Sequence, residues 1–328
     1  MSVLNRRLLL ALVVVFGLSL LAGRVWIDPL GPHQAGASLI LAQLRLPRAC
    51  LAVLVGAGLG SAGAAMQAYL RNPLADPGLF GIAPGAALGA VISLWLGAYG
   101  LKLGFWALPA FALVGAGGAM ALLGLIAGRS GGVALFTLAG MMIASLAGAL
   151  MSLTISLAPS PFALSEIVTW LMGALADRSW REVWVALPLT GIGLGAFGLA
   201  GRSLDALTLG EAAARSLGVE PGRLQALLIV GVGATVGGSV AVAGIIGFVG
   251  LIVPHLLRPF TDRRPSSLIV PSALGGAVLL LVADSLCRIL PLAGGELRLG
   301  IALSLLGGPF FLALLLRMRR GDGWGGWA

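Results

Sequence analysis

The sequence predicts an all-α polytopic membrane protein, and three observations lead to this fold class. Of the 328 residues, 59% are hydrophobic and only 10% are charged, whereas about 25% are charged in typical soluble domains. The mean hydropathy of +1.03 exceeds what the polar surface of a soluble fold allows. Long uncharged runs, without alternation of polar and apolar residues, favour helices over a β-barrel.

Charged residues divide the chain into uncharged runs, and each run with its apolar flanks can hold a span of about 20 residues. Residues 130–165 end in the turn-like Ala158–Pro161, and residues 224–254 contain the Gly-rich Ala243–Gly247. Dividing the second run gives ten predicted spans in a single domain covering residues 1–328. They are residues 8–27, 47–70, 78–98, 105–128, 133–157, 182–201, 223–242, 246–260, 267–290 and 299–317.

The positive charges predict that both chain termini are cytoplasmic. Arginines flank the first span and follow the last, and an even number of spans places both clusters on the side that is rich in Lys and Arg. This orientation puts 13 of the 21 cations inside and 8 outside. The outward cations, which need a second explanation, are Arg24, Arg45, Arg48, Lys102, Arg178, Arg181, Arg288 and Arg298. The pair Arg6–Arg7 could instead open a secretory or twin-arginine signal, but no clear cleavage site follows.

An eight-residue match indicates an internal repeat. Pro84–Val91 and Pro271–Val278 share five of eight residues, although chance similarity between Ala- and Gly-rich helices is the alternative. With ten spans, spans 2–5 and 7–10 form two units of opposite orientation, as in many transporters. Glycine pairs four residues apart, at Gly56–Gly60, Gly85–Gly89 and Gly233–Gly237, predict close helix packing.

The sequence lacks the motifs of an enzyme. Its only lysine, Lys102, lies between two leucines, so a phosphate-binding G-x-x-x-x-G-K-[ST] loop is absent and the chain has no ATPase site of this type. Cys50 and Cys287 are far apart, and only His33 and His255 could join them, so neither a zinc nor an iron–sulfur site is expected. The basic residues form no runs with interleaved aromatics, which argues against a nucleic-acid partner.

Ionisable groups deep in a membrane protein often mark ion coupling. Asp284 is the best candidate, but an ion pair with Arg288 four residues later is the simpler interpretation. The scarcity of other carboxylates in the spans argues against proton or sodium coupling. A passive or ion-coupled transporter without an ATPase remains the alternative at this point.

Residues 202–222 form the longest polar cytoplasmic stretch. Thr208–Glu211 fits a helix capping box, Glu211 and Arg215 are spaced as an ion pair, and Gly218 ends the predicted helix. A solvated loop is one interpretation. A compact amphipathic helix that docks on a soluble partner is the other.

Several motifs together resemble the FecCD-type permeases of the ABC importers for iron chelates, haem and cobalamin. The resemblance covers nearly the whole chain, in order. The motifs are Leu44–Arg48, Ala64–Gln67, Arg71–Gly81, Trp170–Gly173, Leu209–Gly210, Leu217–Val219, Gly244–His255, Ala283–Asp284, Glu296–Leu297, Gly300 and Gly307–Phe310.

The resemblance implies the permease subunit of a type II ABC importer in the inner membrane of a bacterium. Such permeases have ten helices and form a homodimer, with the substrate path along the twofold axis. Two copies of a separate ATPase, which holds ATP and Mg, bind on the inside, and a periplasmic or lipid-anchored binding protein docks on the outside. The chain itself is expected to bind no cofactor, and membrane lipid surrounds it. Ferric siderophore is the commonest cargo of such systems, followed closely by haem and cobalamin.

The resemblance also implies roles for individual residues. Arg45, Arg48 and Arg288 match arginines that meet acidic residues of the binding protein; snorkelling to the membrane interface is the alternative. Asn72 and Leu74 match the cytoplasmic gate. The residues matching the ATPase-coupling region are Leu204, Asp205, Leu207, Leu209, Gly210, Glu211, Arg215, Leu217 and Gly218. Arg298 replaces the proline of the usual Glu-Leu-Pro motif, and its effect is left open, as is the role of Asp284.

Overall fold

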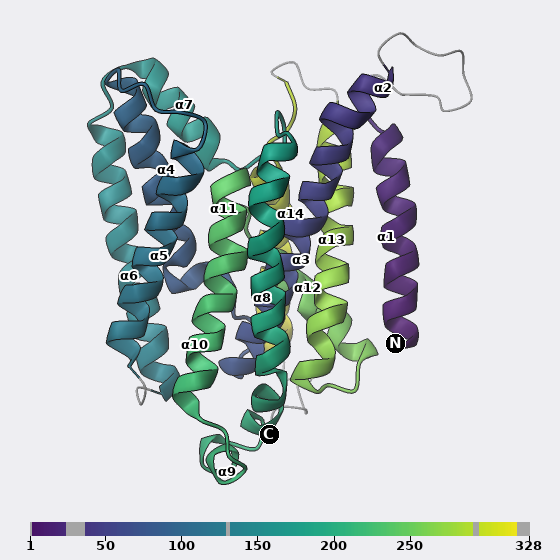
Figure 1. Ribbon diagram of the computed structural model, residues 1–328. Coiled ribbons are helices and arrows are strands. Elements are labelled where there is room, and N and C mark those ends of the chain that lie inside the picture. Colours follow the sequence, from purple (N-terminus) through teal and green to yellow (C-terminus); the bar gives the residue numbers. More distant parts are fainter. Residues whose placement is uncertain (1, 24–36, 129–131, 291–294, 320–328) are drawn as a thin grey trace.

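The computed structural model describes residues 2–23, 37–128, 132–290 and 295–319, and this part of the chain is a bundle of helices (Figure 1). Eight of its helices are long and apolar enough to cross a membrane. They are α1 (Val3–Leu21), the continuous helix Ser38–Tyr69 that ends in α3 (Leu46–Tyr69), α5 (Ala107–Ala127), α6 (Gly132–Ser156), α8 (Trp180–Leu207), the helix Pro221–Ala243 formed by α10, η3 and α11, α13 (Pro265–Ile289) and α14 (Leu299–Arg319).

Three further apolar helices are shorter. These are α4 (Ile82–Ala98), α7 (Pro161–Leu171) and α12 (Val249–Leu257), which continues through η4 to Phe260. The all-helical membrane fold is thus confirmed. The count of ten spans stays a prediction, because α4 and α12, at the third and eighth predicted spans, are too short for the roughly 20 residues that a crossing needs.

The observed helices differ from the predicted spans in three places. The π-helical turn η1 (Leu41–Arg45) joins α2 (Ala37–Ile40) to α3, so the second helix starts about ten residues early. α8 continues to Leu207, which places the first part of the predicted coupling segment in a helix. The loop predicted at Ala158–Pro161 does follow α6, but it leads into α7, a helix that the sequence did not predict; the hydroxyl of Ser160 accepts a hydrogen bond from the backbone N–H of Ala163, and Pro161 suits the first helical position.

The bundle has two ends, which we name by the helices that lie there. The α7 end carries α7 and α2, and the α9 end carries α9 (Glu211–Ser216) and the start of α1 (Figure 1). The predicted coupling segment and the arginines at the start of α3 therefore lie at opposite ends of the molecule.

Both short spans follow a break in the helical backbone. Before α4, the 3-10 turn η2 (Pro77–Phe80) ends at Gly81 with a φ of +78°. Before α12, Gly244 and Phe248 have φ values of +74° and +67°. These breaks precede the third and eighth spans, which are equivalent members of the two predicted repeat units. The eight-residue match, however, joins α4 and α13, which are the third and ninth spans. In the predicted repeat the third span corresponds to the eighth, so this match does not align the two units.

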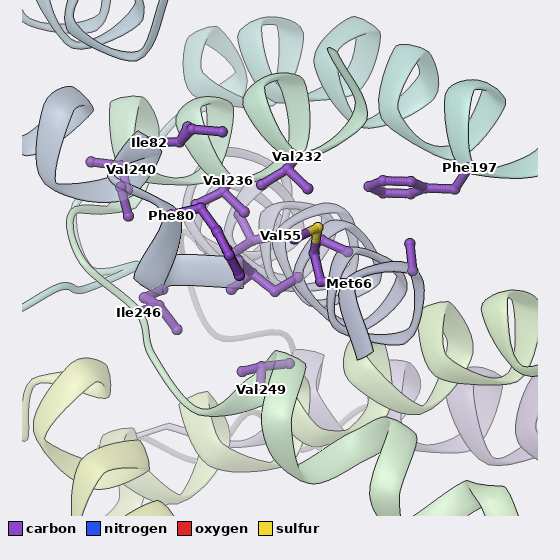
Figure 2. Packing of buried hydrophobic residues seen from close by; sticks show 14 of the residues in the cluster. Val55, Met66, Phe80, Ile82, Phe197, Val232, Val236, Val240, Ile246 and Val249 are labelled. Carbon is purple, nitrogen blue, oxygen red and sulfur yellow. The ribbon is translucent and has the colours of Figure 1, made fainter. Parts of the chain in front are cut away.

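α3 lies at the centre of the bundle and packs most closely against α13. A Cβ atom at Gly56 or Gly60 would collide with the backbone of Gly276 or Ser272, so only glycine allows this approach. The predicted role of the glycine pairs in helix packing is confirmed here. Figure 2 shows the adjoining core, in which Val55 and Met66 of α3 meet valines of the helix Pro221–Ala243 and residues of both breaks.

The outer faces of several helices expose large apolar side chains. They include Leu138, Met141 and Leu153 on α6 and Leu305 and Leu306 on α14. Such faces suit lipid or another apolar protein surface, and they fit the membrane location.

Replacement of Gly56 by Ala should destabilise the α3–α13 contact. The added methyl group meets the backbone of Gly276, and overpacking of this kind costs about 1–3 kcal/mol. Chemical unfolding in detergent, followed by circular dichroism, measures the loss. Gly117→Ala in α5 is the matched control, because no atom lies within 4 Å of its added Cβ. Equal stability of the two variants would contradict the packing argument.

Candidate functional site at the two ends of the bundle

A group of charged residues at the α7 end surrounds Asp284 of α13. Asp284 is only 1% exposed. It accepts three hydrogen bonds from Arg48 of α3, two from Nε at 3.0 Å and one from Nη2 at 2.9 Å. The Nε of Arg288 lies 3.2 Å from Oδ2 of Asp284, so the predicted i,i+4 pair is confirmed. The partner in α3, 236 residues away, was not predicted.

The same group reaches the end of α1. Arg45 donates from Nη1 to the carbonyl oxygens of Leu20 and Leu21, at 2.8 Å each. Arg288 donates to the carbonyl of Ala22 at 3.2 Å and to the hydroxyl of Ser19 at 2.9 Å. The last carbonyls of a helix lack partners within that helix, and cations are favourable beside them. The arginines thus tie α1 to the bundle.

Glu296 completes the group. Its Oε2 atom lies 2.8 Å from Nη2 of Arg48. We call Arg45, Arg48, Asp284, Arg288 and Glu296 the Asp284 network. All three arginines that the resemblance assigns to docking belong to it. Their docking role stays a prediction, but each already binds groups of its own chain.

Arg298, the departure from the family pattern, lies near a second cation. Burial lowers the pKa of Arg178. The negative charges of Glu182 and Asp177 raise this pKa, and the positive charge of Arg298 lowers it further. The extra arginine therefore places like charges close together at the α7 end, outside the Asp284 network.

At the α9 end, the predicted coupling residues divide between the last turn of α8 and the segment after it. Leu204 and Leu207 are buried. Asp205 accepts hydrogen bonds from the backbone N–H of Ser266 at 2.8 Å and from its hydroxyl at 2.6 Å. Because Ser266 lies in the first turn of α13, Asp205 satisfies an end of that helix and joins it to α8.

The predicted capping box is wrong. The hydroxyl of Thr208 donates to the carbonyl of Asp205 at 2.7 Å, and the N-cap of α9 is Gly210, with a φ of +99°. In the described part of the chain, Glu211 forms no ion pair with Arg215, but its Oε1 lies 4.0 Å from Nη2 of Arg71. The short α9 ends before Gly218, whose φ is +85°.

Two leucines flank α9 and face away from the bundle. Leu209 is 66% exposed and Leu217 is 64% exposed. The rest of α9 is short and mostly polar or small, and it protrudes beyond the membrane-length helices (Figure 1). An exposed apolar pair on a polar, protruding segment is typical of a surface that another protein covers.

The predicted gate residues lie in the turn after α3. The side-chain oxygen of Asn72 accepts a hydrogen bond from the N–H of Leu74 at 2.9 Å, which closes an Asx-turn. The neighbouring Arg71 makes the contact with Glu211, so the structure brings this turn beside the coupling segment. Gln67, which sequence reasoning missed, joins the same region to α12 by donating to the carbonyl of Gly250 at 3.2 Å.

A cavity of about 130 Å³ lies between the two backbone breaks. Its lining includes Asp76 and Pro77 from one break, Ile245 and Phe248 from the other, and Ser239 of α11. The carboxylate of Asp76 accepts a hydrogen bond from the N–H of Gly78 at 2.7 Å. The volume holds several water molecules but is well below the roughly 300–1,000 Å³ of ligand pockets. This cavity is therefore not a binding site for a large cargo.

The described residues contain no group of three or more His, Cys, Asp or Glu side chains that could hold a metal ion. Cys50 and Cys287 are both free thiols.

The eight membrane-length helices in the described part of the chain define a helical integral membrane protein. The sequence profile of the FecCD transport family matches residues 9–317, and the chain belongs to this family of ABC importer permeases.

Known proteins are similar over almost the whole chain. The vitamin B12 import system permease protein BtuC of Citrobacter koseri is 38% identical over 322 residues, which are 98% of this chain and 94% of that protein. The protein of the same name from Salmonella typhimurium is 40% identical over 305 residues, or 92% and 91% of the two chains. A solved structure of a metal-chelate type ABC transporter in an inward-facing conformation has a TM-score of 0.87 and 31% identity, and covers 95% of this chain and 98% of its own.

The protein is therefore a permease subunit of a type II ABC importer, a multi-pass protein of the bacterial inner membrane. It is not itself an enzyme, because ATP hydrolysis in this class belongs to a separate subunit. This membership also decides against the alternative of a passive or ion-coupled transporter without an ATPase.

Replacement of Asp284 by Ala should strongly destabilise the bundle. It leaves Arg48 and Arg288 buried without their shared counter-charge, and breaking a buried pair in this way costs about 3–5 kcal/mol. Thermal unfolding in detergent measures the effect. Glu166→Ala on the exposed surface of α7 is the control and should leave the unfolding temperature unchanged. A loss for Asp284→Ala no larger than that of the control would contradict a structural role of the network.

Proposed function

We propose that this permease works as a homodimer between two ATPase subunits at the α9 end and a substrate-binding protein at the α7 end. The observation that carries the proposal is the exposed pair Leu209 and Leu217 beside α9, at the end of the bundle opposite the Asp284 network. With the ATPases inside the cell, the α9 end is cytoplasmic. The start of α1 lies at the same end, which supports a cytoplasmic N-terminus, and ten spans place the C-terminus there too.

A second copy of the chain accounts for part of the exposed apolar surface. Leucines and methionines on α6 and leucines on α14 leave broad faces of two helices without a partner in the described chain. A homodimer covers such faces, and lipid covers the rest. The cargo then passes between the two copies, which fits the small size of the cavities within one copy.

Movement of the ATPases reaches the helices through two contacts. Closure of the ATPases on ATP and Mg displaces α9, which is held by the backbone turns at Gly210 and Gly218. Asp205 passes the displacement to the start of α13 through Ser266. Because α13 packs on α3 without intervening side chains, the two helices move together.

The second contact joins the coupling segment to the gate turn. Glu211 of α9 lies 4.0 Å from Arg71, which precedes Asn72 and Leu74. Asn72 is exposed and Leu74 is half-buried, so the turn can change shape without opening the core of the bundle. In this proposal, Asn72 and Leu74 close the cytoplasmic side of the path until α9 moves.

At the α7 end, Arg45, Arg48 and Arg288 meet acidic side chains of the binding protein. In the permease alone, Arg48 is 12% exposed, and Arg45 and Arg288 are 9% and 4% exposed, so the acidic side chains must enter this end of the bundle to reach them. Charge pairs of this kind also steer and orient association. The cargo is a large organic metal complex. The expectation of a ferric siderophore stays a prediction, and the similarity to two vitamin B12 permeases favours cobalamin over it and over haem.

Replacement of both Leu209 and Leu217 by Ala should weaken binding of the ATPase. A buried leucine contributes about 1.5–3 kcal/mol relative to an exposed one, so the double variant should bind roughly 100-fold more weakly. Titration of the purified ATPase onto permease in lipid nanodiscs measures the affinity. Leu101→Ala is the control, because this leucine, in the loop between α4 and α5, is also exposed, at 52%. Unchanged affinity of the double variant would place the ATPase elsewhere.

Proteoliposomes that contain the permease and its ATPase should import cobalamin when the binding protein and ATP are supplied. Uptake of cyanocobalamin, a ferric siderophore and haem is compared in parallel, with vanadate as the inhibitor of the ATPase. We expect vanadate-sensitive uptake of cyanocobalamin alone. Uptake of the siderophore or haem in its place would overturn the cargo, and uptake that needs no ATP would overturn the coupled mechanism.

A further inference from the structure

The two carboxylates of the Asp284 network are held very differently. Asp284 is 1% exposed and accepts three hydrogen bonds from Arg48. Glu296 is 29% exposed and lies on the connection that leads into α14. Its Oε2 atom is close to Arg48, yet it has no well-aligned hydrogen-bond donor among the residues that the structure describes. Asp284 is thus buried inside the bundle, whereas Glu296 lies at its surface.

Asp284 fixes the direction of the Arg48 side chain. A guanidinium group has five N–H donors in a rigid planar fork. Asp284 holds the Nε and Nη2 positions of that fork against α13, and Arg288 holds Asp284 in turn. The remaining donors of Arg48 are therefore presented at a constant position beside Glu296.

The cost of separating each pair differs accordingly. Removing Asp284 from Arg48 leaves a buried charge without a partner, which is strongly unfavourable. Removing Glu296 from Arg48 leaves the arginine, which is 12% exposed, still paired with Asp284, and Glu296, which is 29% exposed, can turn toward water, so this separation costs less. Another carboxylate can take the place of Glu296 on Arg48, but not that of Asp284.

We infer that Glu296 is an exchangeable counter-ion, which occupies Arg48 until a carboxylate of the docking protein displaces it, while Asp284 positions the arginine. This inference rests on the proposed docking of the binding protein at the α7 end. One ion pair breaks as another forms, so Glu296 lowers the affinity of docking by the free energy of its own contact. Asp284 is a positioning residue in this scheme, and Glu296 is a built-in competitor that favours release.

The test measures the affinity of the substrate-free binding protein for the permease with its ATPase in lipid nanodiscs. Glu296→Gln removes the competing charge at constant size and should bind the protein roughly three- to fivefold more tightly. Glu166→Gln removes an equal charge from α7, outside the network, and should change the affinity less than twofold. Arg48→Gln should weaken docking by at least roughly tenfold, and Glu296→Gln should have no further effect in that background.

The outcomes separate the inference from the proposed function. If Arg48→Gln leaves the affinity unchanged, docking at this arginine is wrong and the inference falls with it. If Arg48→Gln weakens docking but Glu296→Gln behaves like Glu166→Gln, docking stands and the exchange is wrong. A Glu296→Gln variant that loses as much thermal stability as Asp284→Ala also overturns the exchange. Arg48→Lys, which keeps the charge without the fork, replaces Arg48→Gln if the latter does not assemble.

Discussion

An ionised carboxylate inside a helical bundle needs a counter-charge within hydrogen-bond reach, and Asp284 has two. Arg48 and Arg288 bind its two oxygens, and Arg288 with Arg45 also satisfies the last carbonyls of α1. One buried side chain therefore sets the relative positions of α1, α3 and α13. Because separating these charges in an apolar surrounding is costly, the α7 end is a rigid frame.

The glycines of α3 extend this frame along the bundle. Gly56 and Gly60 bring the backbone of α3 against that of α13, so the two helices form one rigid unit from the Asp284 network toward the α9 end. Asp205 then joins the start of α13 to the end of α8. In the proposed coupling, a displacement of the coupling segment passes through the side chain of Asp205 to Ser266 and then along the close contact of α13 with α3. This continuity is the physical basis of the proposed coupling.

Two breaks in the helical backbone, before α4 and before α12, lie beside the rigid pair of α3 and α13. Gly81, Gly244 and Phe248 have positive φ values, and other residues of both breaks, with Phe248, line a small cavity. Broken helices of this kind change shape more easily than continuous ones, and they lie at equivalent places in the two predicted repeat units. The molecule therefore combines the close contact of α3 with α13 and two interruptions of the helical backbone.

Composition and charge placement were sufficient for the helical membrane fold, because solvation by lipid constrains each residue separately. The role of the coupling segment came from the family resemblance and stays a prediction. The pair of Asp284 with Arg288 was also predictable, since four residues make one helical turn. The contact of Asp284 with Arg48 and the pairing of Glu211 with Arg71 were not. They join residues distant in sequence, and only the packing of whole helices decides which side chains meet.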